Sequence, residues 1–314
     1  MTTLSLLTDG SEPMAAVLRE IARVARSRLA VLILGPSGSG KELAARELHR
    51  QSGRPGRLVA VNASAFSESL VESELFGHVQ GAFTGASRDR MGAIEEAEGG
   101  TLFLDEVADL SPRLQSLFLR VLEDRQLRRI GASGSHPVDV RFLAATHRPL
   151  PALAGAGFRR DLLFRLQGAV LTLPGLEQRR HEFPYLVPQL LAGLAADAGR
   201  PAPGLEPGLA QALARLPWPG NFRELRHCLE RALLRCGPGP LGRDHFPELQ
   251  AEADGPGTWQ EATRRFQRDL LQDALRRHGC RITEAARALG LTRPALYAAA
   301  RRLGVDLAEL RAGS

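Results

Sequence analysis

The stretch Gly35-Pro36-Ser37-Gly38-Ser39-Gly40-Lys41-Glu42 decides the fold of this 314-residue chain. It follows a short apolar run, Leu29–Leu34, which stops at the first glycine and therefore predicts a buried strand. A helical pattern over Lys41–Gln51 follows at once. Glycines at this spacing let main-chain N–H groups close around phosphates, and a helix N-terminus favours an anion. The order strand, loop, helix therefore predicts a phosphate-binding loop in an α/β fold.

Lys41 is the only lysine of the chain, which otherwise carries 40 arginines. An ammonium acts at this position as a mobile point charge on β- and γ-phosphates, a role that a planar guanidinium fits poorly. Glu42 stands where such loops usually have the Ser or Thr that ligates Mg²⁺. We therefore expect ATP with Mg²⁺ here, and water in place of a hydroxyl of residue 42 as the metal ligand.

A second motif, Leu102-Phe103-Leu104-Asp105-Glu106, is an apolar strand that ends in two acids. Asp105 is placed to hold Mg²⁺, and Glu106 is placed to polarise the attacking water. An Asp-Glu pair at a strand end is a weak signal alone. It becomes strong at this distance behind a phosphate-binding loop, so we expect an ATPase.

Strands and helices alternate through the first half of the chain, which predicts a parallel sheet covered on both faces. Besides Leu29–Leu34, the predicted strands are Leu58–Val61, Thr101–Leu104 and Val138–Ala145. The predicted helices are Ser11–Ala30 with Ser11 as its cap, Lys41–Gln51, Ala65–Leu75 and Leu114–Glu123, followed by Phe183–Asp197, Pro207–Arg215 and Asn221–Cys236. We expect an α/β core over residues 1–173, a helical subdomain over 174–248, a Gly/Pro-bearing linker over 249–258 and a helical domain over 259–314.

The hexapeptide Gly81-Ala82-Phe83-Thr84-Gly85-Ala86 lies between these two motifs. By composition alone it is either a tight turn with a buried Phe or a mobile loop that presents Phe83 and Thr84 to a partner. Glycine near both ends allows positive φ, so the segment can move as a unit. Its place inside an ATPase core favours the mobile loop.

The charge of the chain is concentrated in its C-terminal part. The net charge is +6, and residues 261–314 hold eleven arginines against six acids, which leaves only +1 for the first 260 residues. This distribution points to a polyanion as partner of the C-terminal part, although a solvated helix face is the alternative. No apolar run is long enough for a membrane span, and no signal pattern is present, so we expect a cytoplasmic protein without a membrane partner.

These motifs together resemble the sigma-54-dependent transcriptional activators, also called bacterial enhancer-binding proteins, which are AAA+ ATPases. The resemblance runs from about Ser11 to Val305. It rests on Ser73–His78, the hexapeptide Gly81–Ala86, Gly99–Glu106 and Trp218–Asn221, which occur in the family's order. The hexapeptide is specific to this family, where it contacts sigma-54. The resemblance implies an AAA+ core, a helical lid and a C-terminal helix-turn-helix.

Further nucleotide-site roles follow from the resemblance, residue by residue. Asn62 matches the Asn that holds the catalytic Glu in check. Thr146 and His147 match sensor I, where the family often has Asn in place of His; a satisfied histidine at the core edge is the alternative for His147. Arg223 matches sensor II on the lid.

The resemblance also implies a ring, commonly a hexamer. Arg159 and Arg165 match the arginines that reach the neighbouring subunit's ATP, and such a group in trans can contribute about 10³–10⁵ in rate. From spacing alone, surface ion pairs are the alternative for both. Residues near Gly131–Pro137 match a second mobile loop that supports the first. After Leu173-Pro174-Gly175-Leu176 the family usually has Arg-Glu-Arg, whereas this chain has Glu177-Gln178-Arg179.

The C-terminal pattern resembles the Fis-type helix-turn-helix, with Thr292–Leu303 as recognition helix. The expected DNA-contacting residues are Thr292, Arg293, Tyr297, Arg301 and Arg302. Where the family typically has basic residues, this helix has Ala298-Ala299-Ala300, which predicts weaker binding with a shallower salt dependence. Paired half-sites and ring avidity would compensate, and a role in assembly is the alternative.

Only about ten residues precede the first predicted helix, so we expect no receiver or ligand-sensing domain there. The leading hypothesis is an ATP-driven remodeller of sigma-54 RNA polymerase bound to upstream double-stranded DNA. The alternative is a DNA-binding regulator that uses nucleotide only to set its oligomeric state, without sigma-54 contact. A third candidate, another AAA+ motor such as an unfoldase, has no reason to carry a Fis-like tail.

Overall fold

The computed structural model describes residues 7–65, 67–83, 86–155 and 157–249, and, further on, Leu271, Leu275, residues 282–288, Leu296, Tyr297 and Ala300. The chain divides into two compact units, residues 1–246 and 247–314. The predicted linker, residues 249–258, lies almost wholly outside the described residues. Within the described residues, no helix combines the length and apolarity that crossing a membrane requires.

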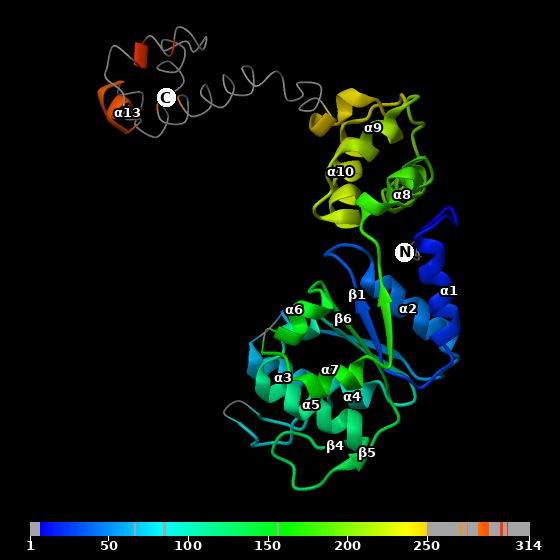
Figure 1. The fold of residues 1–314 in the computed structure, drawn as a ribbon, viewed down its shortest axis with the longest axis vertical. Helices are drawn as coiled ribbons and strands as arrows, with labels where there is room; N and C mark the ends of the chain where they lie inside the picture. The colour runs from blue at the N-terminus through cyan, green and yellow to red at the C-terminus, as the bar shows by residue number, and fades with distance from the viewer. Residues whose placement is uncertain are drawn as a thin grey trace. The chain divides into compact units, whose positions relative to one another are not determined.

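The first unit is built on a parallel sheet of five strands in the order β2-β3-β6-β1-β7 (Figure 1). The strands are β1 (Val31–Leu34), β2 (Leu58–Asn62), β3 (Thr101–Asp105), β6 (Arg141–Thr146) and β7 (Ala169–Thr172). The central strands β1 and β6 are buried along their whole length, as expected of a parallel sheet covered on both faces. The predicted α/β class is therefore confirmed.

Two details of the predicted sheet were wrong. β7 was not predicted, although it contains the short apolar run Ala169-Val170-Leu171; it is an edge strand that is only partly buried. The fourth predicted strand, Val138–Ala145, begins in the structure only at Arg141. Residues 126–127 and 136–137 instead form a separate antiparallel pair, β4 (Gln126–Leu127) and β5 (His136–Pro137), at the base of a loop.

Helices cover both faces of the sheet (Figure 1). One core contains α1 (Met14–Val24) and α2 (Lys41–Ser52) with Val31, Ile33 and Phe103 of the strands. The other contains the alternate strand residues Leu32, Leu104 and Phe142. Its helices are α3 (Glu68–Phe76), α4 (Ala93–Glu96), α5 (Pro112–Asp124), α6 (Leu150–Gly155) and α7 (Arg160–Leu166), with the short turn η1 (Val107–Asp109).

The first helix differs from the prediction at both ends. It begins at Met14 after Pro13, and Ser11 does not cap it, because the Ser11 hydroxyl hydrogen-bonds Asp9 and His181. It ends at Val24, where the buried guanidinium of Arg141 donates to main-chain oxygens of Val24 and Ala25. Those bonds satisfy carbonyl groups that the helix end leaves open.

The helical subdomain follows β7. It consists of η2 (Leu176–Glu182), α8 (Phe183–Asp197), α9 (Leu209–Arg215), α10 (Asn221–Arg235) and η3 (Arg243–His245). Trp218 stacks on Phe183 with ring centroids 6.3 Å apart, and its Nε1 donates to the main-chain oxygen of Leu213 at 2.9 Å. In the second unit, α13 (Ile282–Ala288) shares a small core with Leu271, Leu275, Leu296 and Ala300.

Candidate functional site: a nucleotide cavity and an exposed loop

The glycine loop between β1 and α2 has the backbone that its sequence predicts. Gly38 and Gly40 have φ of +74° and +95°, which glycine adopts without strain. A Cβ on Gly38 would also collide with the main-chain oxygen of Gly220, and Phe222 N donates to Gly38 O at 3.1 Å. The start of α10 therefore lies directly on this loop, and Gly38 is required for that approach.

Lys41 points into the loop and is almost fully buried. Its Nζ donates to Gly35 O at 3.1 Å and Pro36 O at 3.4 Å, and it lies 3.8 Å from Glu106 Oε1. The hydroxyl of Ser39 lies nearby. Among the described residues, its Oγ is the one buried polar side-chain atom without a hydrogen-bond partner. An ammonium held by carbonyl oxygens and a free buried hydroxyl are suited to an entering phosphate.

The two acids at the end of β3 have different environments. Burial, followed by the neighbouring charge of Glu106, raises the pKa of Asp105 above its ordinary value. Burial also raises the pKa of Glu106, but hydrogen bonding by His147 and the charge of Lys41 outweigh it, so this pKa lies below its ordinary value. The surroundings of Glu106 therefore favour its carboxylate form, which a group that polarises water needs.

Glu106 is held by His147 at the end of β6. His147 Nδ1 lies 2.8 Å from Glu106 Oε2, and the main-chain N of His147 donates to the same oxygen at 3.3 Å. Thr146 is fully buried, and its hydroxyl accepts from Arg148 N. Asn62 lies opposite Asp105 in the sheet, but its Oδ1 accepts from the main chain and the hydroxyl of Ser64 at 2.8 Å each.

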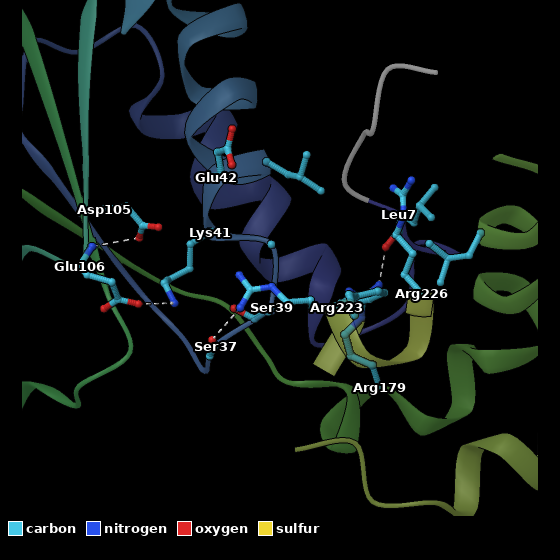
Figure 2. A pocket seen from close by; sticks show the side chains of 15 residues that line it. Leu7, Ser37, Ser39, Lys41, Glu42, Asp105, Glu106, Arg179, Arg223 and Arg226 are labelled. Carbon is cyan, nitrogen blue, oxygen red and sulfur yellow. Dashed lines mark hydrogen bonds and ion pairs between the residues drawn. The ribbon is translucent and has the colours of Figure 1, made fainter. Parts of the chain in front are cut away.

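A cavity of about 310 Å³ opens in front of these groups (Figure 2). Among the residues that the sequence predicted for the nucleotide site, those that line this cavity are Ser37–Glu42, Asp105, Glu106 and Arg223. Arg223 Nη1 lies 3.5 Å from Ser37 Oγ, so the predicted lid arginine faces the loop (Figure 2). The other residues predicted for the nucleotide site are not among the lining residues: Gly35, Pro36, Asn62, Thr146, His147, Arg159 and Arg165.

The far side of the cavity was not predicted from the sequence. It is lined by Leu7, Leu43, Arg179, Leu190, Phe222 and Arg226. Arg179 is buried against Glu182, with Nη2 to Oε2 at 2.8 Å; it also donates to Leu7 O, and its guanidinium lies 5.0 Å from the Phe222 ring centroid. In the sequence, the three-residue spacing of Arg179 and Glu182 could have indicated an ion pair on one helical turn. Only the fold shows that this pair is buried beside the cavity.

Glu42 occupies the position of the usual hydroxyl ligand of the metal, but its side chain is paired with an arginine of its own helix. Its Oε1 accepts from Arg46 Nη2 at 2.6 Å, and its side chain is half exposed. For the described part of the chain, no group of three or more His, Cys, Asp or Glu side chains is arranged to hold a metal. Mg²⁺ needs only one or two carboxylates when substrate phosphates complete its shell, and Asp105 in the cavity wall suits that arrangement.

Arg159 and Arg165 lie at the two ends of α7 and form ion pairs on the surface of this chain. Arg159 holds Asp161 with Nη2 to Oδ2 at 2.6 Å, and Arg165 Nε lies 3.0 Å from Glu123 Oε1. Between them Phe164 is 76% exposed. Two arginines and an apolar ring on the outer face of α7 are available to a neighbouring molecule.

The hexapeptide Gly81–Ala86 combines features of both predicted alternatives. Gly81 N donates to Ala86 O at 2.9 Å, which closes a turn, but Phe83 is 46% exposed and therefore not a buried core residue. The Phe83 ring meets His78 edge-on, with centroids 4.9 Å apart. Thr84 and Gly85 lie outside the described residues.

The neighbouring loop supports this turn. Val79 N donates to Ile130 O at 3.1 Å, and Ile130 N donates to Gly77 O at 3.0 Å. Gly131, with φ of +79°, lies so close that a Cβ there would be 2.8 Å from Ala82 Cβ. The two loops are therefore packed against each other at their bases.

Few of the expected DNA-contacting residues can be placed. Tyr297 is 42% exposed, whereas Thr292, Arg293, Arg301 and Arg302 lie outside the described residues. Leu296 and Ala300 are buried in the small core of the second unit. Ala300 therefore faces this core and not a DNA surface. The absence of a basic side chain at position 300 does not remove a DNA contact, which the sequence pattern alone did not show.

Three family models match successive parts of the chain. A Sigma-54 interaction domain matches residues 7–172, an AAA+ ATPase lid domain matches residues 177–262, and the Fis family of bacterial regulatory proteins matches residues 262–303. These three matches correspond to the order of core, helical subdomain and C-terminal helices.

Curated relatives match over almost the whole chain. The transcriptional regulatory protein ZraR of Salmonella typhimurium is 42% identical over 306 residues, covering 92% of this chain and 67% of ZraR. The response regulator protein PilR of Pseudomonas aeruginosa is 41% identical over 315 residues, covering 96% of this chain and 70% of PilR. The chain thus spans about two thirds of the length of such relatives.

Solved structures of NtrX from Brucella abortus share the fold. The complex with ADP matches with a TM-score of 0.72 and 35% identity, covering 96% of this chain and 69% of NtrX. The complex with ATP matches with a TM-score of 0.71 and 36% identity, covering 96% of this chain and 70% of NtrX.

Proposed function

Since this chain belongs to the sigma-54-dependent transcriptional activators, whose core is an AAA+ domain, we propose that it hydrolyses ATP to remodel sigma-54 RNA polymerase. It would convert the closed promoter complex into the open complex while bound to upstream double-stranded DNA in the cytoplasm. The observation that carries the proposal is the convergence of Lys41, Asp105, Glu106 and Arg223 around one cavity. The loop with the exposed Phe83 is a separate feature of the same unit.

We assign the two sides of the cavity to the two parts of ATP. The main-chain N–H groups of residues 37–40 and the Lys41 ammonium suit the phosphates. The apolar side chains of Leu43, Leu190 and Phe222 suit the base. Both NtrX structures carry an adenine nucleotide, which supports this assignment.

Asp105 would hold Mg²⁺ together with the phosphates, and the metal would supply charge neutralisation at the β- and γ-phosphates. Lys41 now bonds Gly35 O and Pro36 O and lies near Glu106, so an entering phosphate competes for its ammonium. Glu106, freed from Lys41, then orients the attacking water and accepts its proton. Asn62, Thr146 and His147 would report the presence of the γ-phosphate to Glu106.

Arg159 and Arg165 would act on the ATP of a neighbouring subunit in a ring, which we propose to be a hexamer. Their place on the outer face of α7, away from the cavity of their own chain, supports action in trans. Each must first leave its surface partner, Asp161 or Glu123. Such exposed pairs are screened by solvent and contribute little, so exchange for a phosphate is favourable.

The hexapeptide Gly81–Ala86 would contact sigma-54, and the residues Thr292, Arg293, Tyr297, Arg301 and Arg302 would contact DNA. Phe83 is half-exposed, and the base of its turn packs on a second loop, which supports the first assignment. The match to the Fis family and the basic C-terminal part support the second.

In vitro transcription with sigma-54 polymerase tests the proposal. The wild type should form open complexes with ATP but not with a non-hydrolysable analogue. Thr84→Ala should retain measurable ATPase activity and lose open-complex formation. Wild-type activation by Thr84→Ala contradicts the role of the loop, and activation by Lys41→Ala contradicts the ATPase mechanism as a whole.

The alternative is a DNA-binding regulator whose nucleotide only sets the oligomeric state. The exposed Phe83 favours the sigma-54 activator over this alternative, because a regulator without sigma-54 contact needs no exposed apolar residue in this loop. Binding to sigma-54 in the presence of an ATP transition-state analogue distinguishes the two. Binding to sigma-54 that requires Phe83 supports the activator. If sigma-54 does not bind, the alternative is supported.

A further inference from the structure

Two adjacent contacts join the end of β3 to the end of β6. His147 Nδ1 lies 2.8 Å from Glu106 Oε2, and Arg148 Nη2 donates to Asp109 Oδ1 at 2.6 Å. The two strands are neighbours in the sheet, with Leu104 paired to Ala144. Two consecutive residues after β6 therefore hold the first and the last residue of the turn that follows β3.

The turn between these contacts begins in a strained conformation. Glu106 has φ of +52° and ψ of +47°, the left-handed region that side chains larger than Asn rarely adopt. The turn closes with Asp109 N donating to Glu106 O at 2.9 Å. Such a conformation persists only where its surroundings hold it in place, and it determines the direction in which the Glu106 side chain leaves the backbone.

The main chain of Arg148 is held by a buried residue of β6. Its main-chain N donates to the hydroxyl of Thr146 at 3.1 Å, and Thr146 is fully buried in β6. Its guanidinium reaches across to Asp109, whose side chain is 28% exposed. Neither Arg148 nor Asp109 lines the cavity, so an effect of this pair on the reaction must pass through Glu106.

We propose that Arg148 is a positioning residue: its ion pair with Asp109 holds the turn that keeps the backbone of Glu106 left-handed and its carboxylate directed at the reaction. The inference rests on the proposed ATPase function, with Glu106 as the group that orients water. His147 contacts the carboxylate directly, whereas Arg148 fixes the main chain from which the carboxylate extends. Misplacing a reacting group by about 1 Å can cost about 100-fold in rate.

The test compares Arg148→Ala and Arg148→Lys with wild type in steady-state ATP hydrolysis and in the Kd of a fluorescent ATP analogue. We expect kcat to fall by about 10-fold or more in Arg148→Ala, with KM and Kd within about twofold. Arg148→Lys keeps the charge and should recover part of the loss. Arg50→Ala, which breaks the exposed 2.6 Å pair with Glu47 on α2, is the matched control and should leave all three values unchanged.

Epistasis with Glu106 separates positioning from a general structural effect. In a Glu106→Gln background, single-turnover hydrolysis should be no slower when Arg148→Ala is added. The double exchange Asp109→Arg with Arg148→Asp should recover activity relative to either single exchange, which guards against a merely unfolded variant.

An unchanged kcat in Arg148→Ala, a parallel rise of KM and Kd, or a full further loss in the Glu106→Gln background would overturn the inference. The proposed function fails separately, if wild type hydrolyses ATP no faster than Lys41→Ala. Where wild type is active and the Arg148 variants match it, only the positioning role is wrong.

Discussion

Asn221 Nδ2 donates a hydrogen bond to the main-chain oxygen of Ser37 at 3.0 Å and so ties the start of α10 to the phosphate-binding loop. Its Oδ1 accepts from Leu176 N at 2.8 Å, at the start of the helical subdomain. Asn221 is buried and has φ of +50°, which Asn tolerates better than most residues. One side chain therefore joins the loop, η2 and α10.

Asn221→Ala should destabilise the first unit by about 2–4 kcal/mol, because it leaves buried main-chain groups unsatisfied and puts a Cβ-bearing residue without compensation in the left-handed region. Asn221→Gly loses the same hydrogen bonds but suits the backbone, so it should be the more stable of the two. Urea denaturation of both variants measures the difference. An Ala variant as stable as wild type contradicts the role of these bonds.

Lys41→Arg should weaken ATP binding about 10- to 100-fold, although it keeps the positive charge. Lys41 is 93% buried among main-chain oxygens, and a planar fork does not fit where a compact ammonium does. Titration with a fluorescent ATP analogue measures the Kd. Arg46→Ala, on the exposed face of the same helix, is the control that should bind normally; equal affinity of Lys41→Arg and wild type speaks against the point-charge role.

Arg141→Met should destabilise the protein by about 2–4 kcal/mol without changing the cavity. The guanidinium is 2% exposed and donates to main-chain oxygens of Val24, Ala25 and Leu29, which Met leaves unsatisfied. Burial, together with the nearby charge of Arg54, lowers the pKa of Arg141, so removing a buried charge offsets part of the cost. Thermal melting measures the loss, with the exposed Arg120→Met as control.

Gly131→Ala should impair sigma-54 engagement while ATP hydrolysis continues. The new Cβ would lie 2.8 Å from Ala82 Cβ, and φ of +79° disfavours alanine, so the Gly81–Ala86 turn must shift. Gly134→Ala in the same loop is the matched control, because its Cβ would meet nothing within 4 Å. Open-complex formation and ATPase rate are measured together. Equal effects of both substitutions refute the contact between the loops as the cause.

Mixing two inactive variants tests whether Arg159 acts in trans. Arg159→Ala subunits bind ATP but lack the arginine, and Lys41→Ala subunits supply the arginine but do not bind ATP. Each alone should lose hydrolysis about 10³-fold or more, and a mixture should recover measurable activity at their shared interfaces. If Arg159 acts on the ATP of its own chain, no recovery occurs at any ratio.

The chemistry-bearing part of the site was largely predictable because it is encoded locally. Gly35–Lys41 and Asp105-Glu106 each carry their function in consecutive residues after an apolar strand. Ser37–Lys41 of the first motif and both acids of the second line the cavity. The edge strand β7 was missed because its apolar run, Ala169-Val170-Leu171, is short and follows a helix directly, and so short a run does not distinguish a strand from a buried helix segment. The C-terminal end of α1 was missed because the distant Arg141 satisfies its carbonyl groups. Its start was missed because the predicted cap, Ser11, bonds Asp9 and the distant His181 instead.

The sequence by itself determined the α/β order, the phosphate-binding loop, the paired acids and the hexapeptide, because spacing along the chain suffices for each. Only the tertiary structure decided that His147 contacts Glu106, that Arg179 and Phe222 close the cavity and that Asn221 joins the lid to the loop. These contacts join residues 41 to 184 positions apart, or depend on which face of a helix is buried. Packing selects them, and no local pattern records that choice.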